Sequence, residues 1–205
     1  MPTTSQCTRA GYQLLGFSTS NTATTQDSGL TPGASYTPSG NVTLYAVWKA
    51  YKLTIKFNVN GGTITTGTGT TRYRATSAGV VQVSSDSGST WADLSQSITS
   101  ADSYANLWNV GTYGATKTGY YITGTSAYRT AASSGTEINQ DTASASDTNA
   151  ATIARMNGGA LTADTTITLY VYWRSYTLTI KFNTNGGSIT TGTGTTRYRS
   201  NSGTV

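Results

Sequence analysis

The chain has 205 residues, of which only 10% are charged, and it carries a formal net charge of +5 at pH 7. Its 13 Lys and Arg are scattered without a basic run, which argues against a nucleic-acid-binding protein. With 43 Thr and 23 Gly, the composition favours strands and turns, and it predicts an α+β fold in which β-structure dominates.

The residue types that carry most enzyme chemistry are scarce. Histidine is absent and Cys7 is the single cysteine, so the commonest general base and metal ligand, a Cys–His pair and an intramolecular disulfide are excluded. The eight acids show no spacing typical of paired carboxylates. We therefore expect no enzymatic activity, no catalytic residue, no cofactor and no metal.

Membrane insertion is not indicated either. No apolar run approaches the roughly 18 residues of a membrane-spanning helix, and the first residues lack the apolar region of a signal peptide. We expect any export signal or anchor to lie outside this chain. The lack of disulfides does not exclude an extracellular location, since many surface proteins avoid cysteine.

Taken in chain order, residues 1–50 hold two landmarks. AGYQLLGFSTS begins at residue 10, and TLYAVW closes the segment. Both return later, as TGYYITGTSAY from residue 118 and as TLYVYW from residue 168. The Tyr and Trp side chains of the closing segments predict packing in or beside a core, with sugar stacking by exposed tyrosines as the alternative; they are Tyr45, Trp48, Tyr170 and Trp173.

A 30-residue segment then begins that occurs twice. Residues 51–80 start with YKLTIKFNVNGG and residues 176–205 with YTLTIKFNTNGG, and 23 of the 30 aligned positions are identical. The same offset of 125 residues aligns the two closing segments. The repeat predicts one complete module over 51–175, with 1–50 as the tail of another module and 176–205 as a head.

Two explanations account for the divided module. The chain is an excerpt of a tandem array cut in a register that splits one module, or the head and the tail complete each other in space. Completion within one chain and completion between neighbours are both open at this point. The second would turn a sheet edge into an assembly joint by donation of a strand.

Inside the complete module, alternation predicts a strand over 51–59, and Thr-rich sequence predicts a second strand or ribbon over 63–74. NGG at 60–62, 157–159 and 185–187 indicates hairpin turns. Partial helical spacing predicts a helix within 90–108. Further strands are expected over 119–127 and 166–173, separated by a polar loop with a short helix near 150–156.

Residues 84–91, SSDSGSTW, resemble the Asp-box found in sialidases and other propeller proteins. The pattern predicts that Asp86 accepts turn N–H groups, that Gly88 adopts a positive φ and that Trp91 packs beneath. In those families the box fastens a hairpin and is not catalytic. One copy predicts neither a propeller nor a sialidase.

The landmarks CTRAGYQLLGFSTS and GNVTLYAVWKAYKLTIKFNVNGG resemble the Listeria–Bacteroides repeat, which is related to the B repeats of listerial internalins. The likeness covers residues 7–62 and returns at 117–124 and 160–187. Phe17 departs from it, standing where the family has Trp, and Thr125 stands at the equivalent place in the second copy. The repeat-defining residues are the landmark Gly-Tyr pairs, the closing aromatics and the glycine pairs: Gly11, Tyr12, Tyr45, Trp48, Gly61, Gly62, Gly119, Tyr120, Tyr170, Trp173, Gly186 and Gly187.

The resemblance implies tandem β-grasp-like modules in a secreted or wall-attached bacterial protein. It implies a structural segment, such as a stalk, spacer or filament of an adhesin-like protein, whose partners are neighbouring repeats or copies of itself. The alternative is a module that binds a host glycan or protein through the insertion at 81–118, which the plainer composite of head and tail lacks. Its candidate ligand contacts are Trp91, Tyr104 and Trp108.

Overall fold

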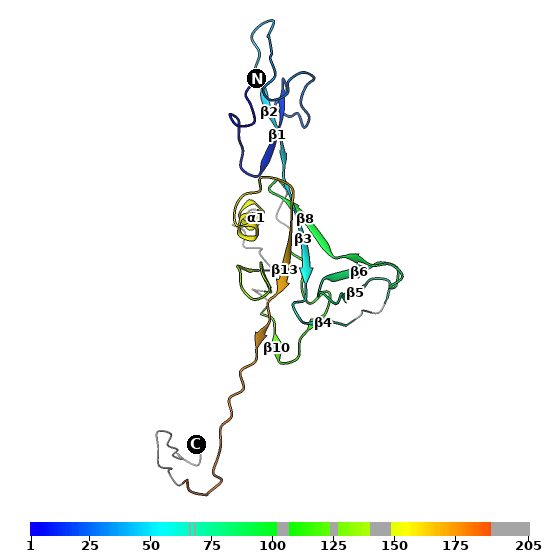
Figure 1. Cartoon of the computed structure of the whole chain (residues 1–205), viewed down its shortest axis with the longest axis vertical. Coiled ribbons are helices and arrows are strands. Elements are labelled where there is room, and N and C mark those ends of the chain that lie inside the picture. Colours follow the sequence, from blue (N-terminus) through cyan, green and yellow to red (C-terminus); the bar gives the residue numbers. More distant parts are fainter. Residues whose placement is uncertain (66, 68, 102–106, 124–126, 140–148, 190–205) are drawn as a thin grey trace. The chain divides into compact units, whose positions relative to one another are not determined.

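The computed structural model describes residues 1–65, 67, 69–101, 107–123, 127–139 and 149–189 (Figure 1). The chain divides into two units, Met1–Arg174 and Ser175–Val205. Strands dominate the described residues, which hold several small sheets and a single helix, so the predicted β-dominated class is confirmed.

The largest sheet has five strands in the order β12-β11-β13-β3-β8. Its strands are β3 (Lys52–Asn58), β8 (Ser95–Thr99), β11 (Tyr128–Arg129), β12 (Glu137–Ile138) and β13 (Thr165–Val171). β3 and β13 are parallel neighbours, with Leu53 opposite Thr165 and Asn58 opposite Tyr170, and the other pairs are antiparallel. Parallel neighbours cannot be joined by a tight turn. The long connection from β3 to β13 instead contributes β8, β11 and β12 to the same sheet.

β3 confirms the strand predicted over 51–59. Its apolar residues recur with the strand period of two, and Leu53, Ile55 and Phe57 are 0% exposed. They lie in one hydrophobic core with side chains from the neighbouring strands and from the helix. β13 and β8 pair with its two edges, and core residues from outside the sheet, among them Ile153 and Met156 of the helix, belong to the cluster that buries this face.

The helix α1 (Asn149–Asn157) confirms the short helix predicted near 150–156. Ile153 and Met156, three residues apart on one face, are buried in the core. Gly158, at φ +78, follows the last helical residue, as is usual for a helix end. The NGG triplet at 157–159 therefore ends a helix, and its prediction as a hairpin turn was wrong.

Smaller sheets carry the rest of the module. β4 (Thr63–Ile64) pairs with β9 (Ala115–Thr116), and a three-stranded sheet has the order β5-β6-β7. Its strands are β5 (Arg72–Ala75), β6 (Val81–Ser84) and β7 (Ala92–Asp93). Two further strands of two residues each are β10 (Tyr120–Tyr121) and β14 (Arg174–Ser175).

The N-terminal residues form a separate two-stranded antiparallel sheet of β1 (Tyr12–Ser18) and β2 (Tyr45–Ala50). Its small hydrophobic cluster is built on Leu14, Phe17 and Leu30. The register shifts between Leu14 and Gly16, where a Cβ atom would lie 2.6 Å from the Leu30 carbonyl oxygen. Glycine is thus needed at residue 16 because the backbone of another segment approaches so closely.

Three further sequence predictions need correction. The helix predicted within 90–108 is wrong, because β7 and β8 occupy this stretch, while residues 102–106 lie outside the described ones. Leu94 and Ile98 are both buried, but a spacing of four residues also keeps two side chains on one face of an extended chain. Hydrogen bonding of β8 to β3 decides between the two structures.

The Thr-rich segment is not one strand. It is divided into β4 and β5, with Thr66 and Thr68 outside the described residues. The turn at residues 60–62 is confirmed, but it is not a hairpin, since β4 pairs with β9 and not with β3. Of the strand predicted over 119–127, the described part contains β10, and 124–126 lie outside it.

Candidate functional site

The two copies of the repeated strand differ in their surroundings. In β3 the side chains of Leu53, Ile55 and Phe57 are 0% exposed. The matching residues 125 positions later form no strand, and their exposed fractions are 82% for Leu178, 63% for Ile180 and 67% for Phe182. Identical LTIKF sequences cannot differ in intrinsic propensity, so the difference lies in which partner covers them. The second copy is a run of exposed large apolar side chains, which is typical of an interaction surface.

The turn that follows the strand is already formed in both copies. The backbone N–H of Asn60 donates to the Asn58 Oδ1 at 2.8 Å, and Asn185 donates to Asn183 Oδ1 at the same distance. Asn60 and Asn185 have φ values of 50° and 48°, and a glycine with positive φ follows each. Local sequence therefore suffices for this turn, while burial of the strand requires a partner.

In the buried copy, side chains join the end of β3 to the closing segment. The Trp173 indole Nε1–H donates to the Val59 carbonyl at 2.7 Å, and the Asn60 side-chain amide donates to the Val171 carbonyl at 3.1 Å. Trp173 also packs so closely on Gly62 that a Cβ atom there would lie 2.4 Å from its ring. These contacts explain why the repeat pairs NxNGG with a closing Trp.

The N-terminal sheet reproduces one side of this arrangement. Phe17 of β1 lies opposite Ala46 of β2, and Tyr128 of β11 lies opposite Val171 of β13. Ala46 and Val171 are equivalent under the repeat offset, so β1 takes the place of β11. On its other edge β13 is covered by β3, whereas the sheet of β1 and β2 has two strands. Among the described residues, the edge of the N-terminal sheet that corresponds to the β3 side is open.

Tyr128 is a residue that the sequence prediction missed. Thr125, aligned with Phe17 from the sequence, lies outside the described residues. The described residue in the structural place of Phe17 is the fully buried Tyr128. Three additional residues between the landmark and this position shift the alignment. The residue equivalent to Phe17 is therefore identified by its buried side chain opposite β13, and not by its distance in sequence from the Gly-Tyr pair.

The Gly-Tyr landmarks have like geometry in both places. Gly11 and Gly119 have φ values of 79° and 80°. The Tyr12 N–H donates to the Arg9 carbonyl at 3.0 Å, and the Tyr120 N–H donates to the Lys117 carbonyl at 3.1 Å. The Arg9 guanidinium lies over the Tyr12 ring, 3.8 Å from its centroid, and the Lys117 ammonium lies over the Tyr120 ring at 4.5 Å. These landmarks are therefore turn-forming residues that begin a strand.

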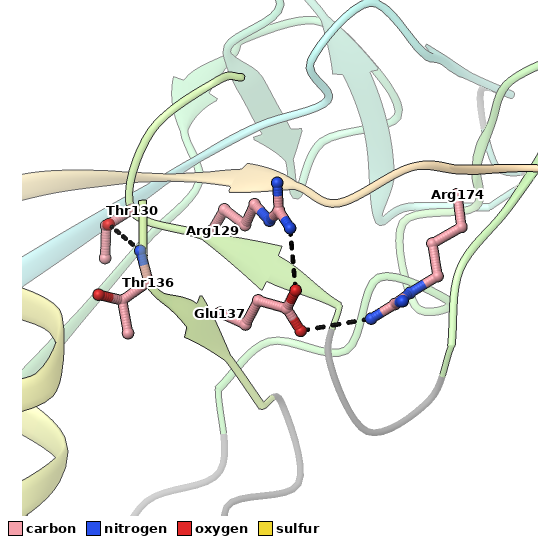
Figure 2. A network of polar contacts seen from close by, with 5 residues as sticks. All are labelled: Arg129, Thr130, Thr136, Glu137 and Arg174. Carbon is pink, nitrogen blue, oxygen red and sulfur yellow. Dashed lines mark hydrogen bonds and ion pairs between the residues drawn. The ribbon is translucent and has the colours of Figure 1, made fainter. Parts of the chain in front are cut away.

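A polar network accompanies the closing segment of the complete module over 51–175, here called the long module (Figure 2). The Glu137 carboxylate accepts hydrogen bonds from Arg129 at 2.9 Å and from Arg174 at 3.3 Å, and both guanidinium groups lie over the Tyr172 ring. The Thr136 N–H donates to Thr130 Oγ1 at 3.0 Å. Because both ion pairs are partly exposed, each contributes at most about 1 kcal/mol. The network fastens β11 and β12 to the closing segment.

The Asp-box prediction is confirmed. Asp86 Oδ1 accepts hydrogen bonds from the Thr90 N–H at 2.8 Å and the Ser84 hydroxyl at 2.7 Å, and Asp86 Oδ2 accepts from the Thr90 hydroxyl at 2.6 Å. Gly88 has a φ of 94°, and the Trp91 Nε1–H donates to its carbonyl at 3.0 Å. These bonds, that of Ser84 first, hold the pKa of the Asp86 carboxyl well below its ordinary value of 3.8.

Asp86 is expected to remain ionised in acid solution. Its folded-state pKa is depressed, so its stabilisation of the hairpin is complete above the ordinary value of 3.8 and is lost as the pH falls toward the folded-state pKa. In an NMR titration, the Asp86 carboxyl signal should still be that of the ionised form at about pH 3. Ser84→Ala should raise its midpoint, and a midpoint near the ordinary value in the unmodified chain would contradict this account.

Two of the three predicted ligand contacts in the insertion, Trp91 and Trp108, make contacts within the module. The Arg74 guanidinium lies over the Trp91 ring, 4.3 Å from the ring centroid, and the ring contacts Gly88. Trp108 is partly buried and meets Tyr73 edge-on, with ring centroids 6.4 Å apart. No ring contact joins Trp91 to Trp108 among the described residues, and Tyr104 lies outside them. Ligand contact through these residues stays a prediction.

Among the described residues, no three Cys, Asp or Glu side chains are grouped so as to hold a metal ion. In the same part of the chain no helix combines the length and apolarity that crossing a membrane requires. A scan against protein-family models and searches of curated proteins and of solved structures gave no match.

Proposed function

We propose that this chain is a structural repeat segment, a stalk, spacer or filament of a bacterial cell-surface or secreted adhesin-like protein, in which modules complete one another by exchanging a strand. The observation that carries the proposal is the contrast between the apolar side chains of the two LTIKF copies, which are fully buried in β3 and largely exposed at 178–182. Strand addition to an open sheet edge is a known mode of assembly, with main-chain hydrogen bonds for affinity and apolar pockets for specificity.

The topology supports the finer proposal of a β-grasp-like module. Its first and last long strands, β3 and β13, lie side by side and parallel in the middle of the sheet. The intervening chain contributes α1, whose Ile153 and Met156 pack on the same core. A module closed by its own last strand has both ends of the chain in the sheet, and a linear array of such modules is a natural spacer.

The proposed extracellular location and the absence of enzymatic activity have a different basis. The resemblance of the landmarks to the Listeria–Bacteroides repeat supports the first, and the lack of histidine with few, scattered acids supports the second. A chain rich in Thr with few charged residues suits a display element. Neighbouring repeats and copies of the chain are the proposed partners.

Strand exchange is tested by mass in solution. Light scattering of the full chain should give an average mass that rises with protein concentration, because each chain offers an exposed second LTIKF copy and an open sheet edge. A chain ending at Ser175 should keep the mass of a monomer over the same range. Circular dichroism serves as control that the shortened chain retains its β-structure. A full chain that stays monomeric at every concentration would remove the basis of the proposal.

A further inference from the structure

We propose that the open edge at residues 40–45 of a second copy of this chain accepts residues 178–183 as a parallel strand, in the register that β3 has on β13. The inference rests on the proposed strand exchange and specifies its acceptor, its register and the source of the donor. Neither residues 40–44 nor residues 178–182 form a strand in the structure, and Asn183 forms only an isolated bridge, so the pairing breaks no existing strand on either side of the joint.

The register follows from the repeat. In the long module Ile55 lies opposite Ile167, and Phe57 lies opposite Leu169. Applying the offset of 125 residues to both strands places Ile180 opposite Val42 and Phe182 opposite Leu44. Val42 is 43% exposed, as expected of a residue whose neighbour strand is missing. The pairing would cover apolar side chains on both sides of the joint.

The edge is determined by β1. Because β1 lies on β2 as β11 lies on β13, with Phe17 in the place of Tyr128, it occupies the edge that does not correspond to β3. If the donated segment is added to the other edge of β2, the order β1, β2, donated segment matches the order β11, β13, β3 in the long module. Strand addition at the edge of β8 would lack this correspondence of sequence.

The side chains that fasten β3 have equivalents at the joint. Trp48 stands where Trp173 does, so its Nε1–H would donate to the carbonyl of Thr184, as that of Trp173 does to Val59. In both copies this carbonyl already accepts the N–H of the second glycine of the turn, at 3.0 Å for Val59 and 2.8 Å for Thr184. The donated turn thus has the geometry that the closing Trp requires before it meets its partner.

A second copy is favoured over the same chain because of reach. β3 and β13 are parallel, so the chain leaves the sheet at Val171, at the end opposite to where Lys52 enters it. The N-terminal segment contacts the entry end, where its residues 9–12 and residues 160–162 line one depression. The seven residues from Val171 to Leu178 can span about 25 Å, and returning along β13 to the entry end uses about 20 Å of that length. Leu178 would have to reach Gly40, its partner in this register, which lies ten residues before the end of β2. The remaining length is too short for this, so the donor comes from a second copy.

Head-to-tail exchange has a consequence for assembly. Each copy carries one donor and one acceptor, and these are different surfaces, so the contact is heterologous and propagates unless the rotation closes a ring. Thr184 stands where the buried Val59 does, which makes the donated strand less apolar than β3 at its end. The exchanged joint should therefore be weaker than the pairing within the module, and its extent should depend on concentration.

The test is disulfide cross-linking between two differently tagged chains, both carrying Cys7→Ser. One carries Val42→Cys and the other Ile180→Cys, two exposed positions. Adjacent strands lie within the spacing that a disulfide can bridge. The matched control replaces the second chain by one with Lys181→Cys, whose side chain points to the opposite face of the strand. Mild oxidation should give several-fold more mixed dimer for Ile180→Cys than for Lys181→Cys.

Three outcomes would overturn the inference. Equal cross-linking of the two pairs, in chains that light scattering shows to associate, would reject this acceptor and register while strand exchange stands. A chain with both Val42→Cys and Ile180→Cys that forms only an intrachain disulfide when dilute, and no mixed dimers, would reject the second copy as the source. Absence of any association would reject the proposed function together with the inference.

Discussion

Ile55→Asp is expected to unfold the long module, whereas Ile180→Asp is expected to leave it folded and to abolish self-association. The two residues occupy the same place in identical LTIKF sequences, but Ile55 is 0% exposed and Ile180 is 63% exposed. Removing a buried Ile side chain costs about 2–5 kcal/mol, and burying an unpaired carboxylate adds several more. The total rivals the roughly 5–15 kcal/mol by which domains are stable.

Both effects can be measured on the same samples. Denaturant unfolding followed by tryptophan fluorescence should lose its cooperative transition for Ile55→Asp and keep it for Ile180→Asp. Light scattering should give a constant monomer mass for Ile180→Asp. Ile55→Val and Ile180→Val are the matched controls, since each retains an apolar side chain and should change either property only slightly. An Ile180→Asp chain that unfolds like Ile55→Asp would mean that the second copy is buried within its own chain.

Features set by neighbouring residues could be predicted from the sequence. The strand at β3 follows from period-two alternation, and the turn after it from Asn and Gly residues that tolerate positive φ. The same holds for the hairpin fastened by Asp86, because its hydrogen bonds reach residues no more than four positions away. The short helix α1 was predicted near its observed bounds.

Features set by distant residues could not. Leu94 and Ile98 have a spacing that fits one face of a helix, and they lie in extended chain because β8 hydrogen-bonds to β3. The candidate joint shows the same limit in its sharpest form, since Phe57 and Phe182 share a local sequence and differ wholly in burial. Internal repetition indicated that the segments correspond, but only the strand order indicates which edge is covered and which is open.

Gly62→Ala is expected to destabilise the folded module, whereas Gly187→Ala should weaken association alone. A Cβ atom at Gly62 would lie 2.4 Å from the Trp173 ring and 2.9 Å from the Thr116 carbonyl oxygen, so the closing segment would have to shift. Overpacking of this kind costs about 1–3 kcal/mol. A Cβ atom at Gly187 would have the Thr184 carbonyl oxygen as its nearest described neighbour, at 3.2 Å.

The second substitution probes the joint because it removes nothing from the folded module. If Trp48 packs on the donated turn as Trp173 packs on Gly62, the added methyl group of Gly187→Ala meets the Trp48 ring and the mass measured by light scattering falls toward that of a monomer. Denaturant unfolding should be unchanged for this variant and shifted to lower denaturant for Gly62→Ala. Should Gly187→Ala associate like the unmodified chain, Trp48 does not close over the donated turn, and the joint is not a copy of the contact between β3 and the closing segment.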